Sequence, residues 1–297
     1  MASISRREAR TGWLFLAPAL LLLGVFFLVP VLSGLALSLT DFDAYAIGSP
    51  DLARFVGIDN YVQTLASDEF WAALRNTLYF AVLAGPLSIL VSLGAALLVD
   101  APITRARAVF RVAYFVPVVT TLVAVAIVWR YLYHPRYGVL NFLLGLVGVD
   151  PIHWLGDPHW AMPAIVILAV WKNFGYNMLI FVAGLQSVPK ELYEVAAVDG
   201  AGRRHQFLHI TVPSLAPIFL FVGITTMIGS FQVFAEPYVM TQGGPLGSTR
   251  TLLLHMYEEG FRWWRLGTAS TIAVLLLILT LIGTAVQLRL RPDRNDG

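Results

Sequence analysis

The chain has 297 residues, of which 58% are hydrophobic and only 13% are charged, and its mean hydropathy is +0.72. Soluble domains are about 45 to 50% apolar and about 25% charged, so this composition leaves too few charges for a water-exposed surface and predicts a membrane protein. The formal net charge is +2, and cysteine is absent. That absence excludes disulfide scaffolds, thiolate nucleophiles, cysteine zinc sites and iron–sulfur clusters.

Six apolar stretches are long enough to cross a bilayer, whose hydrocarbon core of ~30 Å takes about 20 helical residues. They cover residues 13–39, 77–99, 109–131, 161–185, 212–234 and 268–288. The first stretch is longer than the ~7 to 15 residues of a signal-peptide core, so it is predicted to be an uncleaved anchor. The sequence lacks the alternating decamers of an outer-membrane barrel. The predicted fold is therefore an all-α integral membrane protein with six transmembrane helices.

The distribution of Arg and Lys predicts the orientation, because cytoplasmic loops carry an excess of both residues. With the N-terminus inside, twelve of the 20 fall in cytoplasmic segments, seven fall in outer segments and Lys172 lies within a span. Both termini are thus expected in the cytoplasm of a multi-pass protein of the cell (inner or plasma) membrane. The predicted division is a cytoplasmic segment (1–12), a membrane domain (13–290) and a cytoplasmic tail (291–297).

The longest inward-facing segment, residues 187–213, predicts two short helices. Pro189 suits a first helical turn, where its missing N–H costs nothing, and Glu191 suits the positive end of the helix dipole. Gly200 can take the left-handed conformation that ends a helix. We therefore expect one helix from about residue 189 to 198 and a second over about 202–209. Small and acidic side chains here suit a rigid protrusion that fits a groove on another protein, and an ordinary amphipathic interfacial helix is the alternative.

The same loop resembles the cytoplasmic signature of ABC importer permeases, which reads Glu-Ala-Ala, three residues, Gly, nine residues and Ile-x-Leu-Pro. The spacing in this chain is the same, with Val195 and Val212 in place of Ala and Leu. Both replacements keep an apolar side chain. The resemblance implies a short cytoplasmic coupling helix between the fourth and fifth transmembrane helices. It assigns ATPase coupling to Glu194, Ala196, Ala197, Asp199, Gly200, Ala201, Ile210 and Pro213.

Further stretches resemble the carbohydrate-uptake permeases of the maltose and glycerol-phosphate type, and most of all the first of their two paired subunits. They are residues 40–43 (TDFD), 57–61 (GIDNY), 154–158 (WLGDP), 184–191 (GLQSVPKE), 229–234 (GSFQVF) and 238–245 (YVMTQGGP). The resemblance implies a permease of an ATP-driven importer for a sugar or sugar-like solute. Its implied partners are a second permease subunit, two copies of an ABC ATPase and an extracytoplasmic solute-binding protein.

Neither lysine of the chain follows a glycine, so the sequence contains no phosphate-binding P-loop. We expect the chain to be a transport subunit and no enzyme, without a cofactor of its own, while the partner ATPase binds ATP and Mg. His205 and His209 are four residues apart, but no carboxylate-rich motif accompanies them, and no metal site is expected. Membrane lipid is an expected partner, and nucleic acid is not.

Polar groups within spans usually face a cavity or another helix. In the fourth span, Asn173, Tyr176 and Asn177 share one helix face, and Lys172 lies near mid-membrane. Amide, hydroxyl and aromatic groups suit a sugar. The predicted substrate path comprises Lys172, Asn173, Tyr176, Asn177, Ser230, Gln232 and Glu236. Hydrogen bonding between helices of the permease pair is the alternative.

Two other classes of protein remain as alternatives. An ion-coupled secondary transporter usually carries acidic residues within its spans and an internal repeat, whereas the mid-span ionisable residue here is Lys172 and no repeat is evident. An integral-membrane lipid-modifying enzyme needs a nucleophile or a titratable cluster at the interface. None of the six histidines lies in such a pattern.

Overall fold

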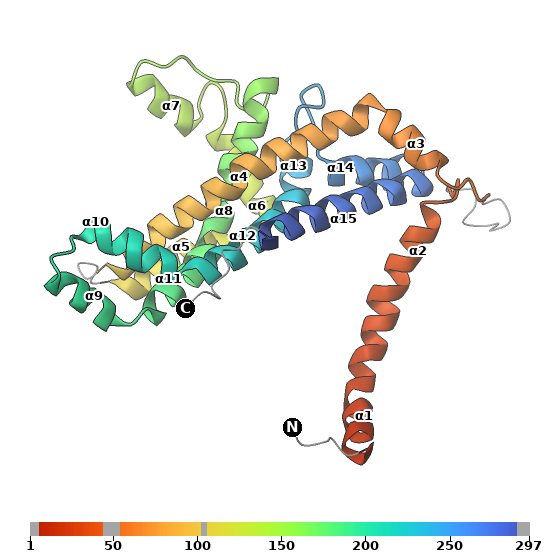
Figure 1. Ribbon diagram of the computed structural model, residues 1–297. Coiled ribbons are helices and arrows are strands. Elements are labelled where there is room, and N and C mark those ends of the chain that lie inside the picture. Colours follow the sequence, from red (N-terminus) through yellow and green to blue (C-terminus); the bar gives the residue numbers. More distant parts are fainter. Residues whose placement is uncertain (1–5, 44–53, 102–105, 290–297) are drawn as a thin grey trace. The chain divides into compact units, whose positions relative to one another are not determined.

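The computed structural model describes residues 6–43, 54–101 and 106–289 (Figure 1). Within these ranges the chain is helical, and its β-pairing is limited to one bridge between Thr40 and Phe55. The prediction of an all-α protein is confirmed. Residues 1–5 of the predicted N-terminal segment and the whole predicted tail, 291–297, lie outside the described residues.

Four helices are long and apolar enough to cross a membrane, and two bent helix pairs bring the number of candidate spans to as many as six. The four are Arg10–Leu37, Asp68–Asp100, Pro158–Ser187 and Leu266–Arg289. The pairs are Arg107–Val119 with Leu122–Leu132, bent by 99°, and Arg203–Ser214 with Ala216–Phe231, bent by 64°. The second helix thus begins well before the predicted residue 77.

The predicted third span, 109–131, is divided into two helices that meet at a sharp bend. Pro117 lies near the end of the first part, and Thr120 and Thr121 have extended backbone with ψ of 146° and 133°. An extended pair of residues cannot continue the i to i−4 hydrogen bonds, and Pro117 provides no N–H for them. The chain therefore changes direction at these residues.

The described residues fall into two compact units. The first comprises residues up to 67 together with 256–277. It contains α1 (Arg6–Leu23), the π-helical η1 (Gly24–Leu28), α2 (Val29–Leu37), α3 (Asp59–Ala66), η5 (Glu258–Arg262) and the start of α15 (Leu266–Arg289). The Ser38 carbonyl accepts hydrogen bonds from Asn60 Nδ2 (3.0 Å) and Thr271 Oγ1 (3.2 Å). The end of α2 is thereby joined to α3 and α15.

The second unit contains the remaining helices. They are α4 (Asp68–Asp100), α5 (Arg107–Val119), α6 (Leu122–Leu132), α7 (Val139–Leu146), α8 (Pro158–Ser187), α9 (Lys190–Val198), α10 (Arg203–Gln206), η4 (Phe207–Thr211), α11 (Val212–Ser214), α12 (Ala216–Phe231), α13 (Ala235–Met240) and most of α14 (Leu252–Tyr257). Helix α8 packs against α4, α5 and α12. A side chain at Gly175 of α8 would collide with the Tyr114 carbonyl of α5, so glycine permits this close crossing.

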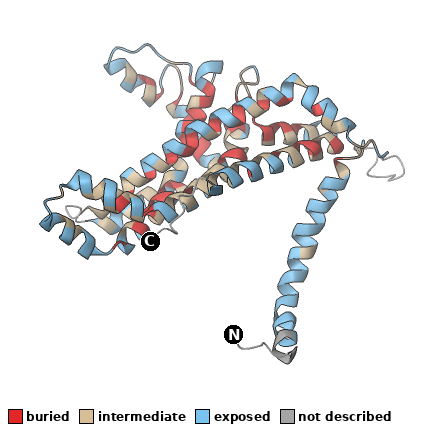
Figure 2. Cartoon of the chain, viewed as in Figure 1, coloured by how far each residue is buried: buried red, intermediate tan, exposed pale blue. Residues whose placement is uncertain are grey.

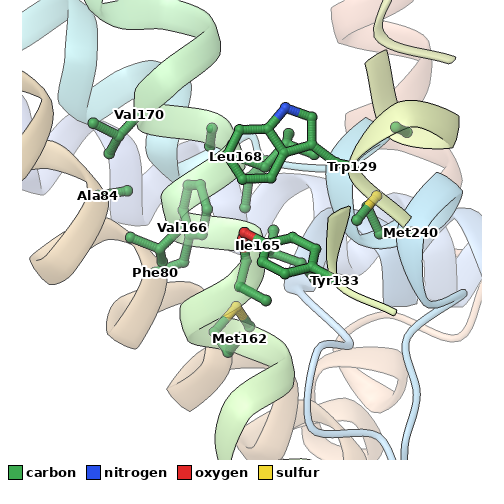
Figure 3. Packing of buried hydrophobic residues seen from close by; sticks show 14 of the residues in the cluster. Phe80, Ala84, Trp129, Tyr133, Met162, Ile165, Val166, Leu168, Val170 and Met240 are labelled. Atoms are coloured by element: carbon green, nitrogen blue, oxygen red, sulfur yellow. The ribbon is translucent and has the colours of Figure 1, made fainter. Parts of the chain in front are cut away.

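The core of the second unit lies along α8 (Figure 2). Figure 3 shows Ile165, Met162 and Leu168 of α8 packed with Trp129 and Tyr133 from the α6 region. The buried Tyr133 hydroxyl donates to the Ala164 carbonyl at 2.7 Å, which satisfies its polar group. By contrast, large apolar side chains of α1 and η1, such as Phe15 and Phe26, are exposed. Such exposure is expected for a helix that contacts lipid.

Candidate functional site

A cavity of about 610 Å³ lies within the second unit, bounded by residues of α4, α8, α12 and the turn into α13. Phe80 and Phe234 contribute aromatic surface to it. The polar part of its lining consists of Ser88, Asn173, Tyr176, Asn177, Thr225, Thr226, Ser230, Gln232 and Glu236. The cavity therefore combines apolar faces with hydroxyl and amide groups, the composition typical of a small-molecule site.

Six of the seven residues of the predicted substrate path line this one cavity; Lys172 does not. Asn173, Tyr176 and Asn177 have the spacing i, i+3, i+4, which places them on one face of α8. Ser230 lies in the last turn of α12 and Gln232 directly after it. The cavity thus gathers polar groups from two predicted spans that are distant in sequence.

Asn177 is buried and connects three helices. Its Nδ2 donates to Thr226 Oγ1 of α12 at 3.1 Å and lies 3.5 Å from Ser88 Oγ of α4. Tyr176, the next residue along, is 51% exposed. Interhelical hydrogen bonding, the alternative for these residues, therefore applies to Asn177, whereas Tyr176 presents its side chain to open space.

Glu236 lies in the first turn of α13, just beyond the span that ends at Phe231. Burial raises the pKa of its carboxyl group, and a backbone hydrogen bond and the charge of Lys172 offset part of that rise. Among the described residues that line the cavity, Glu236 is the only carboxylic acid, and none is Lys, Arg or His.

Lys172 takes a different position from its neighbours on α8. Its Nζ donates to the carbonyls of Pro117 (3.3 Å) and Val118 (3.4 Å), in the last turn of α5. These carbonyls lie where the α5 hydrogen-bond ladder stops, and a cation at the C-terminal end of a helix is favourable. The contact occurs at the break that divides the predicted third span.

Sequence reasoning missed Ser88, Thr225 and Thr226, which line the cavity beside the predicted residues. The signal was available, because each is a polar side chain within an apolar stretch. Serine and threonine hydroxyls also bond to their own helix backbone, as Thr225 does to the Phe221 carbonyl at 2.9 Å. Composition alone therefore does not separate the two roles.

The segment of residues 187–213, called the inner loop after its predicted orientation, contains α9 (Lys190–Val198) with Pro189 as its N-cap residue, and Gly200 follows with φ of +80°. Glu194, Ala197 and Asp199 are exposed, whereas Ala196, Ala201 and Ile210 are half-buried. The Tyr193 hydroxyl and Thr211 Oγ1 are 2.9 Å apart, which joins α9 to η4. The geometry agrees with the expected first helix and its glycine stop.

A helix is present over the expected range 202–209, but it extends further, because α10, η4 and α11 follow one another from Arg203 to Ser214. The predicted span start at residue 212 and the exposed Pro213 lie inside this run. The bend falls at Leu215, where φ is −82° and ψ is −1°. The buried Leu215 side chain packs with Phe181 and Val182 of α8, so packing against α8 fixes the position of the bend.

No group of three or more His, Asp or Glu side chains that would suit a metal ion occurs in the part of the chain that the structure describes. The rings of His205 and His209 stack with centroids 4.0 Å apart. His209 Nδ1 lies 3.1 Å from the His205 carbonyl oxygen, one turn earlier in the same helical run. These two histidines are thus placed as neighbours on one exposed helical face.

Residues 88–295 match the family described as binding-protein-dependent transport system inner membrane component. The chain belongs to this family. It is therefore an inner-membrane transport subunit and not an enzyme, as the resemblance in sequence implied. Membership favours a binding-protein-dependent importer over the ion-coupled transporter and the lipid-modifying enzyme considered from sequence.

The chain is similar over nearly its whole length to permeases of sugar transport systems. It is 36% identical to the lactose transport system permease protein LacF of Rhizobium radiobacter, with 99% of this chain and 98% of that one covered. It is 34% identical to the trehalose/maltose transport system permease protein MalF of Thermococcus litoralis, with the same coverage. A bacterial alginate ABC transporter, solved with an alginate-bound periplasmic protein, has a similar fold (TM-score 0.78, 21% identity, covering 95% of this chain and 94% of that one).

Proposed function

We propose that this chain is one permease subunit of an ATP-driven importer that carries a sugar delivered by an extracytoplasmic binding protein. Its partners are a second permease subunit and two copies of an ABC ATPase, which bind and hydrolyse ATP with Mg. The observation that carries the proposal is the cavity inside the family's membrane domain, whose lining includes six polar residues picked out from sequence. Relatives at 34 to 36% identity are named as permeases of lactose and trehalose/maltose systems.

The proposed solute is uncharged. A sugar phosphate or uronate binds most favourably beside a cation, because a buried charge is costly unless it is paired. The candidate cation, Lys172, is instead directed at the carbonyls of α5, and the ionisable acid at the cavity is Glu236. In its ionised form this carboxylate repels anions, and its oxygens accept hydrogen bonds from hydroxyl groups. A neutral sugar such as lactose is compatible with the charge of this lining, whereas an acidic polysaccharide such as alginate is not.

The proposed solute contacts divide into two kinds. Tyr176 supplies an accessible aromatic face on which a sugar ring can rest, and Asn173 and Gln232 supply amides for its hydroxyl groups. Asn177 and Ser230 are buried and bonded within the bundle, and they set the shape of the cavity. Glu236 then excludes anionic solutes from its outer end.

The proposed coupling element is α9. Its acidic Glu194 and its exposed apolar residues Leu192, Val195 and Val198 suit a cleft on the ATPase. Because the Leu215 bend packs against α8, movement of α9 is transmitted to α8 and α12, which both line the cavity. The residues assigned to this role are Glu194, Ala196, Ala197, Asp199, Gly200, Ala201, Ile210 and Pro213.

The proposed topology has six membrane spans within residues 13–290, with both termini and α9 in the cytoplasm. The bent pairs α5 with α6, and α10 to α12, each count as one span. Support comes from the four unbroken candidates, the two bent pairs and the excess of Arg and Lys in the segments placed inside. The outer end of the cavity then lies at α13.

The test is to tag the chain in its native host, extract the complex in mild detergent and identify the proteins that purify with it. An ATPase, a second permease and a binding protein are expected. The recovered binding protein is then titrated by calorimetry with neutral disaccharides and with uronate and phosphate sugars. Purification without an ATPase would contradict the importer, whereas tight binding of an anionic sugar would contradict only the proposed solute class.

A further inference from the structure

A second large cavity, of about 900 Å³, lies in the second unit between the inner loop and the ends of α4, α5 and α8. Figure 1 shows α9 and α10 grouped at this end of the unit. It is separate from the cavity proposed for the solute, because the two have no lining residue in common. None of the residues proposed above for solute contact or for ATPase coupling lines it.

The charges at this cavity are unbalanced. Among the described residues, Arg107, Lys190 and Arg203 line it, against the single carboxylate of Asp100. Asp100 Oδ1 accepts a hydrogen bond from Gln186 Nε2 at 3.1 Å, and among the described residues it forms no ion pair with the three cations. Cations at one cavity repel one another unless an anion lies between them.

The remaining walls suit an amphipathic ligand. Leu97, Leu185, Val188 and Phe207 give an apolar side, and Tyr193 and Gln206 add hydrogen-bonding groups. Gln206 Nε2 donates to the Ala201 carbonyl at 3.1 Å, so it is already positioned by the loop. Basic cavities between membrane helices on the cytoplasmic side are known to bind anionic headgroups.

From these observations we infer that the cavity is a binding site for a phosphate group, supplied either by the headgroup of an anionic lipid or by a free phosphate. Arginine and lysine pair with phosphate through charge-assisted hydrogen bonds. Arg107 holds the site from the bundle side, where its Nη2 also donates to the Ala101 carbonyl at 3.2 Å. Lys190 and Arg203 hold it from the inner loop.

Such a ligand has a mechanical consequence. Lys190 begins α9 and Arg203 begins α10, whereas Arg107 begins α5. An anion bound to all three links the loop proposed to contact the ATPase to the helix bundle. Occupancy therefore restrains the loop, and removal of the anion releases it.

The experiment uses the complete transporter in nanodiscs, which leave both faces of the membrane accessible, so the result does not depend on the proposed orientation. Native mass spectrometry counts phosphatidylglycerol retained from mixed phosphatidylcholine and phosphatidylglycerol discs. The variant is the double substitution Lys190→Gln and Arg203→Gln. The matched control is Arg204→Gln, an exposed neighbour that does not line the cavity.

Wild type and the control are expected to retain phosphatidylglycerol, and the double variant is expected to lose about fivefold in affinity for each cation removed. In pure phosphatidylcholine discs, inorganic phosphate is added while hydrogen exchange of residues 190–206 is followed. Protection by phosphate identifies a free anion as the ligand, and retention of phosphatidylglycerol alone identifies the lipid. The inference is overturned if wild type responds to neither, or if the Arg204 variant loses as much as the double variant.

Discussion

The solute cavity and the inner loop of the second unit differ in how their residues are held. The cavity draws side chains from α4, α8, α12 and α13, and hydrogen bonds such as Asn177 to Thr226 fix them across helices. The loop is one continuous segment whose key residues, among them Glu194 and Asp199, are mostly exposed. Changes in the cavity therefore act through packing and solute contact, whereas changes in the loop act through what binds it.

The largest expected effect comes from the loop. Gly200→Val is expected to abolish uptake while the protein still inserts, because φ of +80° disfavours a β-branched side chain by about 1 to 2 kcal/mol. No atom lies within 4 Å of a Cβ built there, so the effect is on backbone conformation and not a collision. Glu194→Lys is expected to abolish uptake by reversing the charge that α9 presents. Transport assays in cells measure uptake, and membrane fractionation measures insertion of the protein.

Gly202→Ala is the matched control for Gly200. Gly202 also has open space around a Cβ, but its φ is −69°, which alanine adopts readily. We expect this variant to transport like wild type. Normal uptake by the Gly200 and Glu194 variants would remove the loop from the coupling mechanism.

Within the cavity, adjacent residues are expected to behave differently. Asn177→Ala leaves the half-buried hydroxyl of Thr226 and the buried hydroxyl of Ser88 without their amide partner, and it is expected to lower the free energy of unfolding by about 1 to 3 kcal/mol. Tyr176→Ala changes an exposed side chain and is expected to shift stability by no more than about 0.5 kcal/mol. Its effect is expected on solute affinity instead.

Thermal unfolding and solute binding of the purified complex separate these two roles. A Tyr176 variant that unfolds as easily as the Asn177 variant would mean that the whole α8 face is structural. In that case the assignment of Tyr176 to the solute would fail.

Glu236→Gln tests the proposed solute class. The change keeps the size of the side chain and removes its charge, so binding of a uronate sugar relative to a neutral one is expected to rise about tenfold. Glu69→Gln is a suitable control, because Glu69 lines a different cavity of the same unit. An unchanged ratio in the Glu236 variant, measured by calorimetry on the complex, would show that this carboxyl does not select against anions.

The same contrast explains which features the sequence could predict. The α9 helix and its stop depend on neighbouring residues, Pro189 and Gly200, so local rules were sufficient. The break between α5 and α6 is harder to predict, because only Thr120 and Thr121 interrupt the apolar residues there. Proline, as at Pro117, is also tolerated within membrane helices. Lys172 illustrates the limit for the site. It is the neighbour of Asn173 in sequence and is therefore grouped with it. The position of the α5 carbonyls in the folded protein, however, determines where its Nζ lies.

The smallest expected effect concerns histidines in the two regions. His255 is buried, and burial, with the nearby charge of Arg250, lowers the pKa of its imidazole, while Glu69 opposes that shift. Because the pKa is lowered in the folded state, the unfolded chain takes up this proton more readily than the folded chain does. The free energy of unfolding is therefore expected to decrease as the pH falls below about 6.5. Thermal unfolding of the purified protein between about pH 8 and pH 5 should show this loss, and His255→Gln should reduce it. His209→Gln, at an exposed histidine of the inner loop, is the matched control substitution. Identical pH curves for wild type and the His255 variant would show that other groups cause the loss.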